Sequence, residues 1–196
     1  MAVAFIFDFE KARAAILYLA QKNLPDFDKG KTCKLLFLVD KLHLVQYGRP
    51  VTGDLYWALE HGPVPTHVLD LLDHLEQKKT SSDQARALSA GLELDRRFAN
   101  PRFRALQGPD MSVLSKSDIG VLDRIADLHG RKTFAELRAL THEMVAYQRA
   151  WKRKRAGKRA APMAFEDFFE EDADAIAGTR EEMLENAALR KAFPAP

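Results

Sequence analysis

Residues 34–65, with the sequence KLLFLVDKLHLVQYGRPVTGDLYWALEHGPVP, decide the fold of this chain. From about Lys31 to Tyr47, apolar side chains occur at almost every azimuth of a helix, which indicates a helix that is buried on all sides. Gly48 stands where a left-handed helix end is expected, and Pro50 prevents the helix from continuing. This segment is therefore predicted to be the central helix of the fold.

The second part of the stretch, residues 54–60, alternates between apolar and other side chains and predicts a strand with one buried face. We expect Trp57 to be buried and Tyr56 to be exposed, with the reverse arrangement if the register slips by one residue. Gly62 and Pro63 predict a turn after the strand.

Helical spacing and capping signals predict further helices on both sides of this stretch. Their expected starts are Asp8, Pro65 or Thr66, Ser115 and Thr133, and the last helix is expected to continue through Trp151. Two weaker alternating segments, 92–95 and 103–106, flank a turn signal at Asn100 and Pro101 and predict a hairpin that can join residues 54–60 in one sheet. The prediction is a mainly α (α+β) fold: a compact helical domain with a small antiparallel β-sheet or hairpin and a C-terminal helical extension.

The composition is that of a globular protein. Of the 196 residues, 46% are hydrophobic and 30% are charged. A single cysteine, Cys33, excludes an internal disulfide and suits a reducing cytoplasm, so we expect a cytoplasmic protein. The first residues lack the basic region of a signal peptide, and no apolar run approaches the ~20 residues of a membrane helix.

Charge is distributed unevenly along the chain, although the net charge is only +2. Residues 1–130 balance, residues 131–160 carry 10 basic and 2 acidic side chains, and residues 161–196 carry 3 basic and 9 acidic ones. We therefore divide the chain into a domain of residues 1–150 and a charged extension of residues 151–196, a basic linker followed by acidic helices.

No set of residues amounts to a catalytic site, and we predict neither an enzyme nor a bound cofactor. Asp40 and His43 share a helix face and, with Glu60, His61 and His67, could be considered as metal ligands. We favour instead a histidine hydrogen-bonded to a carboxylate inside the core, and predict no metal site. The glycines fit no phosphate-binding pattern and are interpreted as turn residues.

The stretch 34–65 resembles the core motif of the Panacea domain, also called the SocA-like antitoxin or phage-associated domain. The positions that carry the resemblance are Lys34, Leu35, Leu36, Asp40, His43, Leu44, Tyr47, Gly48, Arg49, Pro50, Thr52, Gly53, Asp54, Tyr56, Ala58, His61, Gly62, Pro63, Val64 and Pro65. A second block is similar to the family's L-S-x-x-[DE] and L-[TS]-H motifs, at residues 114–118 and 140–142. Tyr147 lies near the position where the family usually has a tryptophan, and Trp151 lies further on.

The resemblance covers about residues 8–150 and implies a predominantly helical fold with a small sheet. It also implies an antitoxin that binds and neutralises a protein toxin encoded beside it. One type within the family, SocA, is a proteolytic adaptor that delivers its toxin to the ClpXP protease. Sequence reasoning leaves both direct neutralisation and delivery open.

Candidate partner-binding residues come from the strand and turn, from the helix around residue 142, and from the basic segment. They are Tyr56, Glu60, His61, His142, Glu143, Tyr147, Arg153 and Arg155. The basic run 152–159 is interpreted as a solvated linker, with binding to an acidic partner or to nucleic acid as alternatives. A DNA-binding regulator that uses residues 149–159 is thus the second function considered, and it is not favoured.

Overall fold

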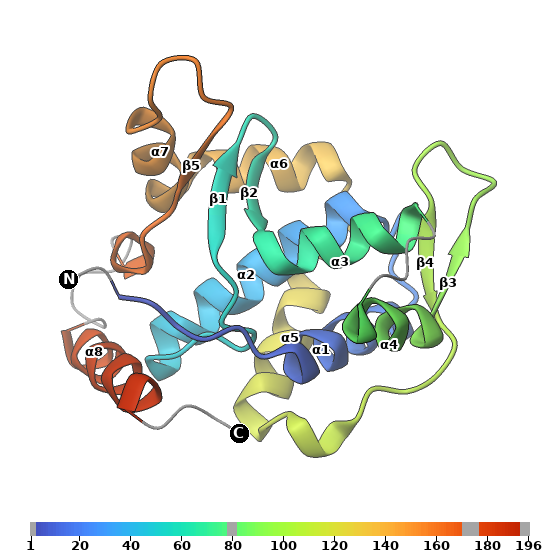
Figure 1. The fold of residues 1–196 in the computed structure, drawn as a ribbon, viewed down its shortest axis with the longest axis horizontal. Coiled ribbons are helices and arrows are strands. Elements are labelled where there is room, and N and C mark those ends of the chain that lie inside the picture. Colours follow the sequence, from blue (N-terminus) through green and yellow to red (C-terminus); the bar gives the residue numbers. More distant parts are fainter. Residues whose placement is uncertain (1–2, 78–81, 170–176, 193–196) are drawn as a thin grey trace.

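Helix α2 (Lys29–Tyr47) runs through the middle of the computed structural model, which describes residues 3–77, 82–169 and 177–192 (Figure 1). It packs against five other helices and against the β1–β2 hairpin. The Asp28 side chain caps its start by accepting from the Lys31 N–H, and Gly48 ends it with a φ of 63°. The predicted central helix and its glycine end are confirmed.

The other helices surround α2. They are α1 (Phe9–Gln21), α3 (Thr66–Glu76), α4 (Asp83–Gly91), α5 (Lys116–His129), α6 (Phe134–Glu143), α7 (Val145–Lys152) and α8 (Ala177–Ala192), with short 3-10 helices η1 (Met111–Val113) and η2 (Phe165–Phe169). The capping boxes predicted at Ser115 and Thr133 are both present. Within the described residues, no helix is long and apolar enough to cross a membrane.

One of the predicted helices is in fact two helices, so the prediction of a continuous helix was wrong. The helix expected to run from Thr133 through Trp151 divides at Met144, whose ψ of 135° is extended. The break redirects the chain, so that α7 packs against β1, β5 and η2. Ala146, Tyr147 and Ala150 are buried by this packing, and a straight continuation of α6 would not have the same contacts.

The strands form two separate antiparallel sheets. In the first, β2 (Gly62–Pro65), β1 (Tyr56–Leu59) and β5 (Ala160–Pro162) lie in the order β2-β1-β5. In the second, β3 (Leu92–Asp95) pairs with β4 (Arg102–Ala105), which confirms the predicted hairpin. The expectation that this hairpin joins residues 54–60 was wrong, because β4 packs against α1 at the other end of the molecule (Figure 1).

The turn of the first hairpin also differs from the prediction. Residues 60 and 61 make the turn, while Gly62 and Pro63, expected to turn the chain, are already paired with Leu59 and Ala58. Prolines argue against a central strand, but β2 is an edge strand of the sheet, where a missing N–H is tolerated.

The buried face of β1 is the reverse of the expected one. Tyr56 is 2% exposed, and Trp57 is 37% exposed. The Tyr56 hydroxyl donates to the carboxylate of Asp40 at 2.9 Å, so this aromatic ring is held inside by a polar partner that hydropathy alternation does not reveal. The candidate role of Tyr56 as an exposed contact residue is therefore corrected.

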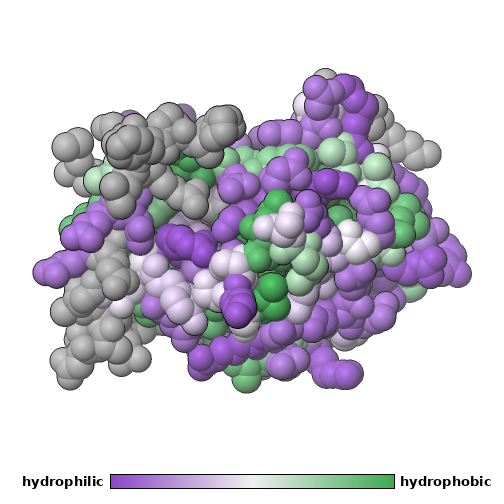
Figure 2. All heavy atoms as spheres, turned by 90° about the horizontal axis from the view of Figure 1, so that it is seen from below, coloured by the Kyte–Doolittle hydropathy of each residue, from purple (hydrophilic) through white to green (hydrophobic). Residues whose placement is uncertain are grey.

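The chain beyond residue 151 contributes to the same core. β5 pairs with β1, and Phe165, Phe168 and Phe169 of η2 are buried among the core side chains. The short acidic helix expected around Phe165 is this 3-10 helix, and residues 170–176 lie outside the described part of the chain. Seen from below, the surface is mostly hydrophilic, with apolar residues gathered in small groups (Figure 2).

We expect Phe168→Ala to lower the free energy of unfolding by about 3–5 kcal/mol, because it opens a cavity beside Phe37 and Tyr56. Urea unfolding followed by circular dichroism measures the change. Leu184→Ala is the control, since Leu184 is 51% exposed and should shift stability by less than about 0.5 kcal/mol. Equal, small effects of the two variants would show that η2 is not part of the core.

Candidate partner-binding site

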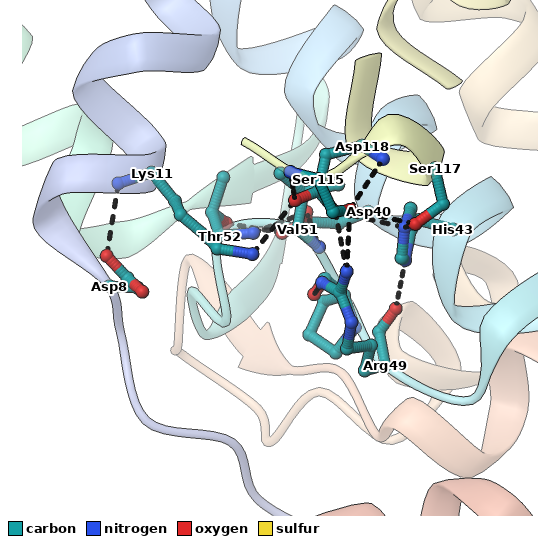
Figure 3. A network of polar contacts seen from close by, with 11 residues as sticks. Asp8, Lys11, Asp40, His43, Arg49, Val51, Thr52, Ser115, Ser117 and Asp118 are labelled. Atoms are coloured by element: carbon teal, nitrogen blue, oxygen red, sulfur yellow. Dashed lines mark hydrogen bonds and ion pairs between the residues drawn. The ribbon is translucent and has the colours of Figure 1, made fainter. Parts of the chain in front are cut away.

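Asp40, in the middle of α2, organises the loop that leads into the first sheet. Its carboxylate accepts the backbone N–H groups of Val51 and Thr52 at 2.9 Å each and the Thr52 hydroxyl (Figure 3). It also accepts the Tyr56 hydroxyl at 2.9 Å. It is fully buried, and burial raises its pKa to about 6 although these donors favour the charged form. The motif residues Asp40, Thr52 and Tyr56 thus have a structural role.

Asp118, in the first turn of α5, is another fully buried carboxylate. Lys11 and Arg49 approach its oxygens at 2.9 Å and His43 Nε2 at 3.0 Å, and the Ser115 N–H donates to it at 2.9 Å (Figure 3). Burial alone would raise its pKa, but the hydrogen bonds from His43 and Lys11 hold that pKa far below the ordinary value. This network ties α1, α2 and the loop after α2 to the start of α5.

The histidine–carboxylate pair expected in the core therefore exists with a different partner. His43 Nδ1 donates to the Arg49 carbonyl at 2.7 Å, and its Nε2 faces Asp118 rather than Asp40. A further buried carboxylate, Asp54, caps α3 by accepting hydrogen bonds from the N–H groups of His67 and Val68. Within the described residues, no group of three or more histidine, cysteine or acidic side chains could hold a metal ion.

The two sequence blocks of the motif meet at the turn of the β1–β2 hairpin. Lys34 of α2, which is 1% exposed, donates from Nζ to the Pro63 carbonyl at 2.8 Å. A Cβ on Gly62 would lie 2.9 Å from this Nζ and 3.1 Å from Thr141 Oγ1, and Gly62 has a φ of 101°. Glycine is therefore required where α2, the hairpin and α6 come together.

Lys34 carries its charge in an apolar setting. Within the described residues Lys34 forms no ion pair with a carboxylate, and burial lowers its pKa to about 8, with Arg138 adding a smaller repulsion. Beside it, His142 has a buried Nε2 without a hydrogen-bond partner among the described residues, and burial lowers its pKa as well. The hairpin turn thus covers two basic groups, neither of which has an anionic partner in the described part of the chain.

Aromatic rings continue from this point along α7. The His142 ring stacks on Tyr147 with centroids 4.4 Å apart, and Tyr147 stacks on Trp151 at 6.0 Å. The Tyr147 hydroxyl donates to the Leu59 carbonyl at 2.8 Å, which fixes α7 against β1. Lys154 Nζ lies 5.0 Å from the centre of the Trp151 ring.

An open groove of about 810 Å³ runs past the hairpin turn, and we call it the turn groove. Its walls are formed by α2, the β1–β2 hairpin, α3, the start of α6, the end of α7 and the basic loop. The lining residues are Lys29, Gly30, Cys33, Lys34, Leu59, Glu60, His61, Val64, Leu69, Phe134, Trp151, Lys154, Lys158 and Arg159. Apolar side chains thus alternate with a cluster of cations, as in a surface that contacts another protein.

A second groove, of about 640 Å³, follows β5 and is lined by Trp57, Arg153, Arg155, Lys158 and neighbouring residues. Trp57, Val64 and Pro162 are cross-strand partners, so they share the exposed face of the first sheet. Lys158 lines both grooves. The exposed sheet face and the basic loop therefore form one continuous candidate surface.

The structure brings together most of the sequence-predicted contact residues. Glu60, His61, Glu143, Arg153 and Arg155 are exposed, and His142 is half-buried. Tyr147, like Tyr56, is buried at 4% exposure, because its hydroxyl reaches the Leu59 carbonyl, so its expected place on the surface is corrected. Arg149 and Arg153 both pair with Asp167, which neutralises part of the basic segment.

Sequence reasoning missed other members of the surface. Trp151 and Phe134 were not considered as contact residues, Trp57 was considered but expected to be buried, and Lys154, Lys158 and Arg159 were considered only as part of the basic run. The basic run 152–159 was a signal for the last three, but nothing in the sequence indicates that β5 returns this run to the side of the hairpin.

A family model described as antitoxin SocA-like, Panacea domain, matches residues 33–152, more than half of the chain. The chain belongs to the SocA-like antitoxin family. The Panacea domain so defined contains the buried carboxylates Asp40, Asp54 and Asp118 and the hairpin, and its match ends just before Lys154, Lys158 and Arg159. No curated protein and no solved structure matches the chain.

We expect Asp118→Asn to lower the free energy of unfolding at pH 7 by about 3 kcal/mol or more, because Lys11 and Arg49 lose their buried anion and His43 loses its carboxylate partner. The pKa of Asp118 is depressed in the folded state, so its charge stabilises the fold above the unfolded pKa of about 4, and this contribution is lost as the pH falls below that value. The difference between wild type and variant should therefore shrink below about pH 4.

Urea unfolding at several pH values between 3 and 7 measures this difference. Asp123→Asn on the same helix is the matched control, because Asp123 is about two-fifths exposed and its ion pair with Lys22 should contribute less than about 1 kcal/mol. A difference for Asp118→Asn that stays constant from pH 7 to pH 3 would contradict the assigned network.

Proposed function

We propose that this protein is the antitoxin of a toxin–antitoxin pair, and that it neutralises a cognate protein toxin by binding it stoichiometrically. The observation that carries the proposal is the match of residues 33–152 to an antitoxin domain. The arrangement of the chain supports a binding role, because its buried carboxylates Asp40, Asp54 and Asp118 are all engaged in helix caps and loop contacts. The exposed side chains around the hairpin include tryptophan, phenylalanine and arginine, types that are enriched in protein interfaces.

The finer form of the proposal concerns the fate of the toxin. Neutralisation can consist of binding alone, or the antitoxin can deliver the toxin to the ClpXP protease, as the SocA type does. The C-terminal extension after residue 151 is compatible with the adaptor form. The toxin's half-life in cells with and without ClpX distinguishes the two: delivery requires a shorter half-life only when both this protein and ClpX are present.

DNA binding through residues 149–159 is the weaker candidate. A duplex binder needs several cations free to meet phosphates. In this chain Arg149 and Arg153 are paired with Asp167, and Lys154 lies against Trp151.

We expect the product of a small reading frame next to this gene to arrest growth when expressed alone, and co-expression of this protein to restore growth. The two products should elute together with a fixed stoichiometry in size-exclusion chromatography. As a control, Phe168→Ala, which weakens the core, should reduce rescue in proportion to its loss of folded protein. The absence of a toxic neighbour, or toxicity that this protein does not relieve, would refute the antitoxin role.

A further inference from the structure

We propose that the turn groove binds an acidic segment of the toxin that also carries bulky apolar side chains. This inference rests on the proposed function and adds the chemistry of the partner and its place on the molecule. It follows from three features of the groove: its apolar lining, its unpaired cations and its closed strand edge.

The apolar lining comes largely from the hairpin and from α6 and α7, with Leu69 of α3 beside them. Leu59 and Val64 lie on the hairpin, Phe134 begins α6, and Trp151 is near the end of α7. Phe134 is 37% exposed, and Leu59, Val64 and Trp151 are partly exposed. Large apolar side chains of a partner would gain contact area here without any movement of the buried core.

The charge of the groove is strongly asymmetric. Lys154, Lys158 and Arg159 form one side, and within the described residues none of them has an ion pair with a carboxylate. Lys34 lies beneath the turn and also lacks such a partner among those residues. Glu60 is the single acid among the described lining residues, so the groove is complementary to Asp and Glu side chains.

Lys29 shows how a cation in this region behaves when acids are available. Its Nζ lies 2.6 Å from Asp73 and 2.5 Å from Glu76, two acids of α3. The described residues supply no comparable acids to Lys158 and Arg159, which are both exposed. A partner's carboxylates would therefore meet cations that do not have to break an existing ion pair first.

The strand edge next to the groove restricts how a partner docks. β2 is the edge strand, Pro63 and Pro65 have no N–H to offer, and the Pro63 carbonyl is already taken by Lys34. A partner strand cannot extend the sheet on this side. The acidic segment must therefore bind through its side chains, which places the specificity in the apolar contacts and the cations.

The test begins with a random peptide library displayed on phage and selected against the purified full-length protein. We expect enriched sequences to combine Asp or Glu with Phe, Trp, Leu or Met. For the strongest peptide, the dissociation constant should rise by about tenfold or more in Lys158→Glu/Arg159→Glu, and by about fivefold in Phe134→Ala, measured by isothermal titration.

Lys116→Glu/Arg124→Glu is the matched control. It reverses two exposed cations on α5, neither of which lines the turn groove or the second groove. Its affinity should remain within about twofold of wild type. Circular dichroism confirms that each variant is folded before titration. Enrichment of peptides without acids, or equal binding by all variants, would overturn the proposal.

The same variants separate this inference from the antitoxin role. In the growth-rescue assay, wild type and Lys116→Glu/Arg124→Glu should neutralise the toxin, while Lys158→Glu/Arg159→Glu should not. Rescue by every variant would refute the groove as the toxin site and leave the antitoxin role intact. Failure of wild type to rescue would refute the antitoxin role, and salt-sensitive binding of duplex DNA that only Lys158→Glu/Arg159→Glu abolishes would assign the groove to nucleic acid instead.

Discussion

A single buried carboxylate, that of Asp40, determines how the chain leaves its central helix. A carboxylate with no exposure to water is tolerated only when its oxygens accept hydrogen bonds. The backbone N–H groups of residues 51 and 52 donate two of these bonds. Because the Tyr56 hydroxyl binds the same carboxylate, β1 must begin with this ring turned inward. Trp57 consequently faces outward, so the exposed face of the first sheet depends on an interaction in the core.

Asp118 attaches α1 and α5 to the central helix α2 and to the loop that follows it. Its partners Lys11, His43 and Arg49 come from α1, α2 and the following loop, so one side chain fixes three segments to α5. A third contact, Lys34 with the Pro63 carbonyl, keeps the hairpin on α2. The contacts of Asp40, Asp118 and Lys34 together involve most of the polar residues of the motif. The motif that identifies the family is therefore chiefly a description of its scaffold.

The sequence predicts this fold where local signals decide the structure. Asp8, Ser115 and Thr133 cap helices through contacts three residues away, and Gly48 ends α2 by its own conformation, so each was foreseeable. The inward face of β1, the break at Met144 and the return of β5 depend on partners far along the chain. Hydropathy favoured Trp57 over Tyr56 for the core, because no local pattern shows that Asp40 lies beneath the strand. The candidate site was foreseen only in its turn and its basic run.

The cations of the turn groove lie just outside the segment that matches the family, and this position indicates how one scaffold can bind different partners. The match ends at residue 152, and Lys154, Lys158 and Arg159 follow immediately. β5 then fastens this loop to β1, which keeps the cations beside the hairpin although they contribute nothing to the buried networks. Substitutions in the loop can therefore change the charge and shape offered to a partner without disturbing Asp40, Asp118 or Lys34. Separating the contact residues from the folding residues in this way allows partner recognition to vary while the stability of the domain is preserved.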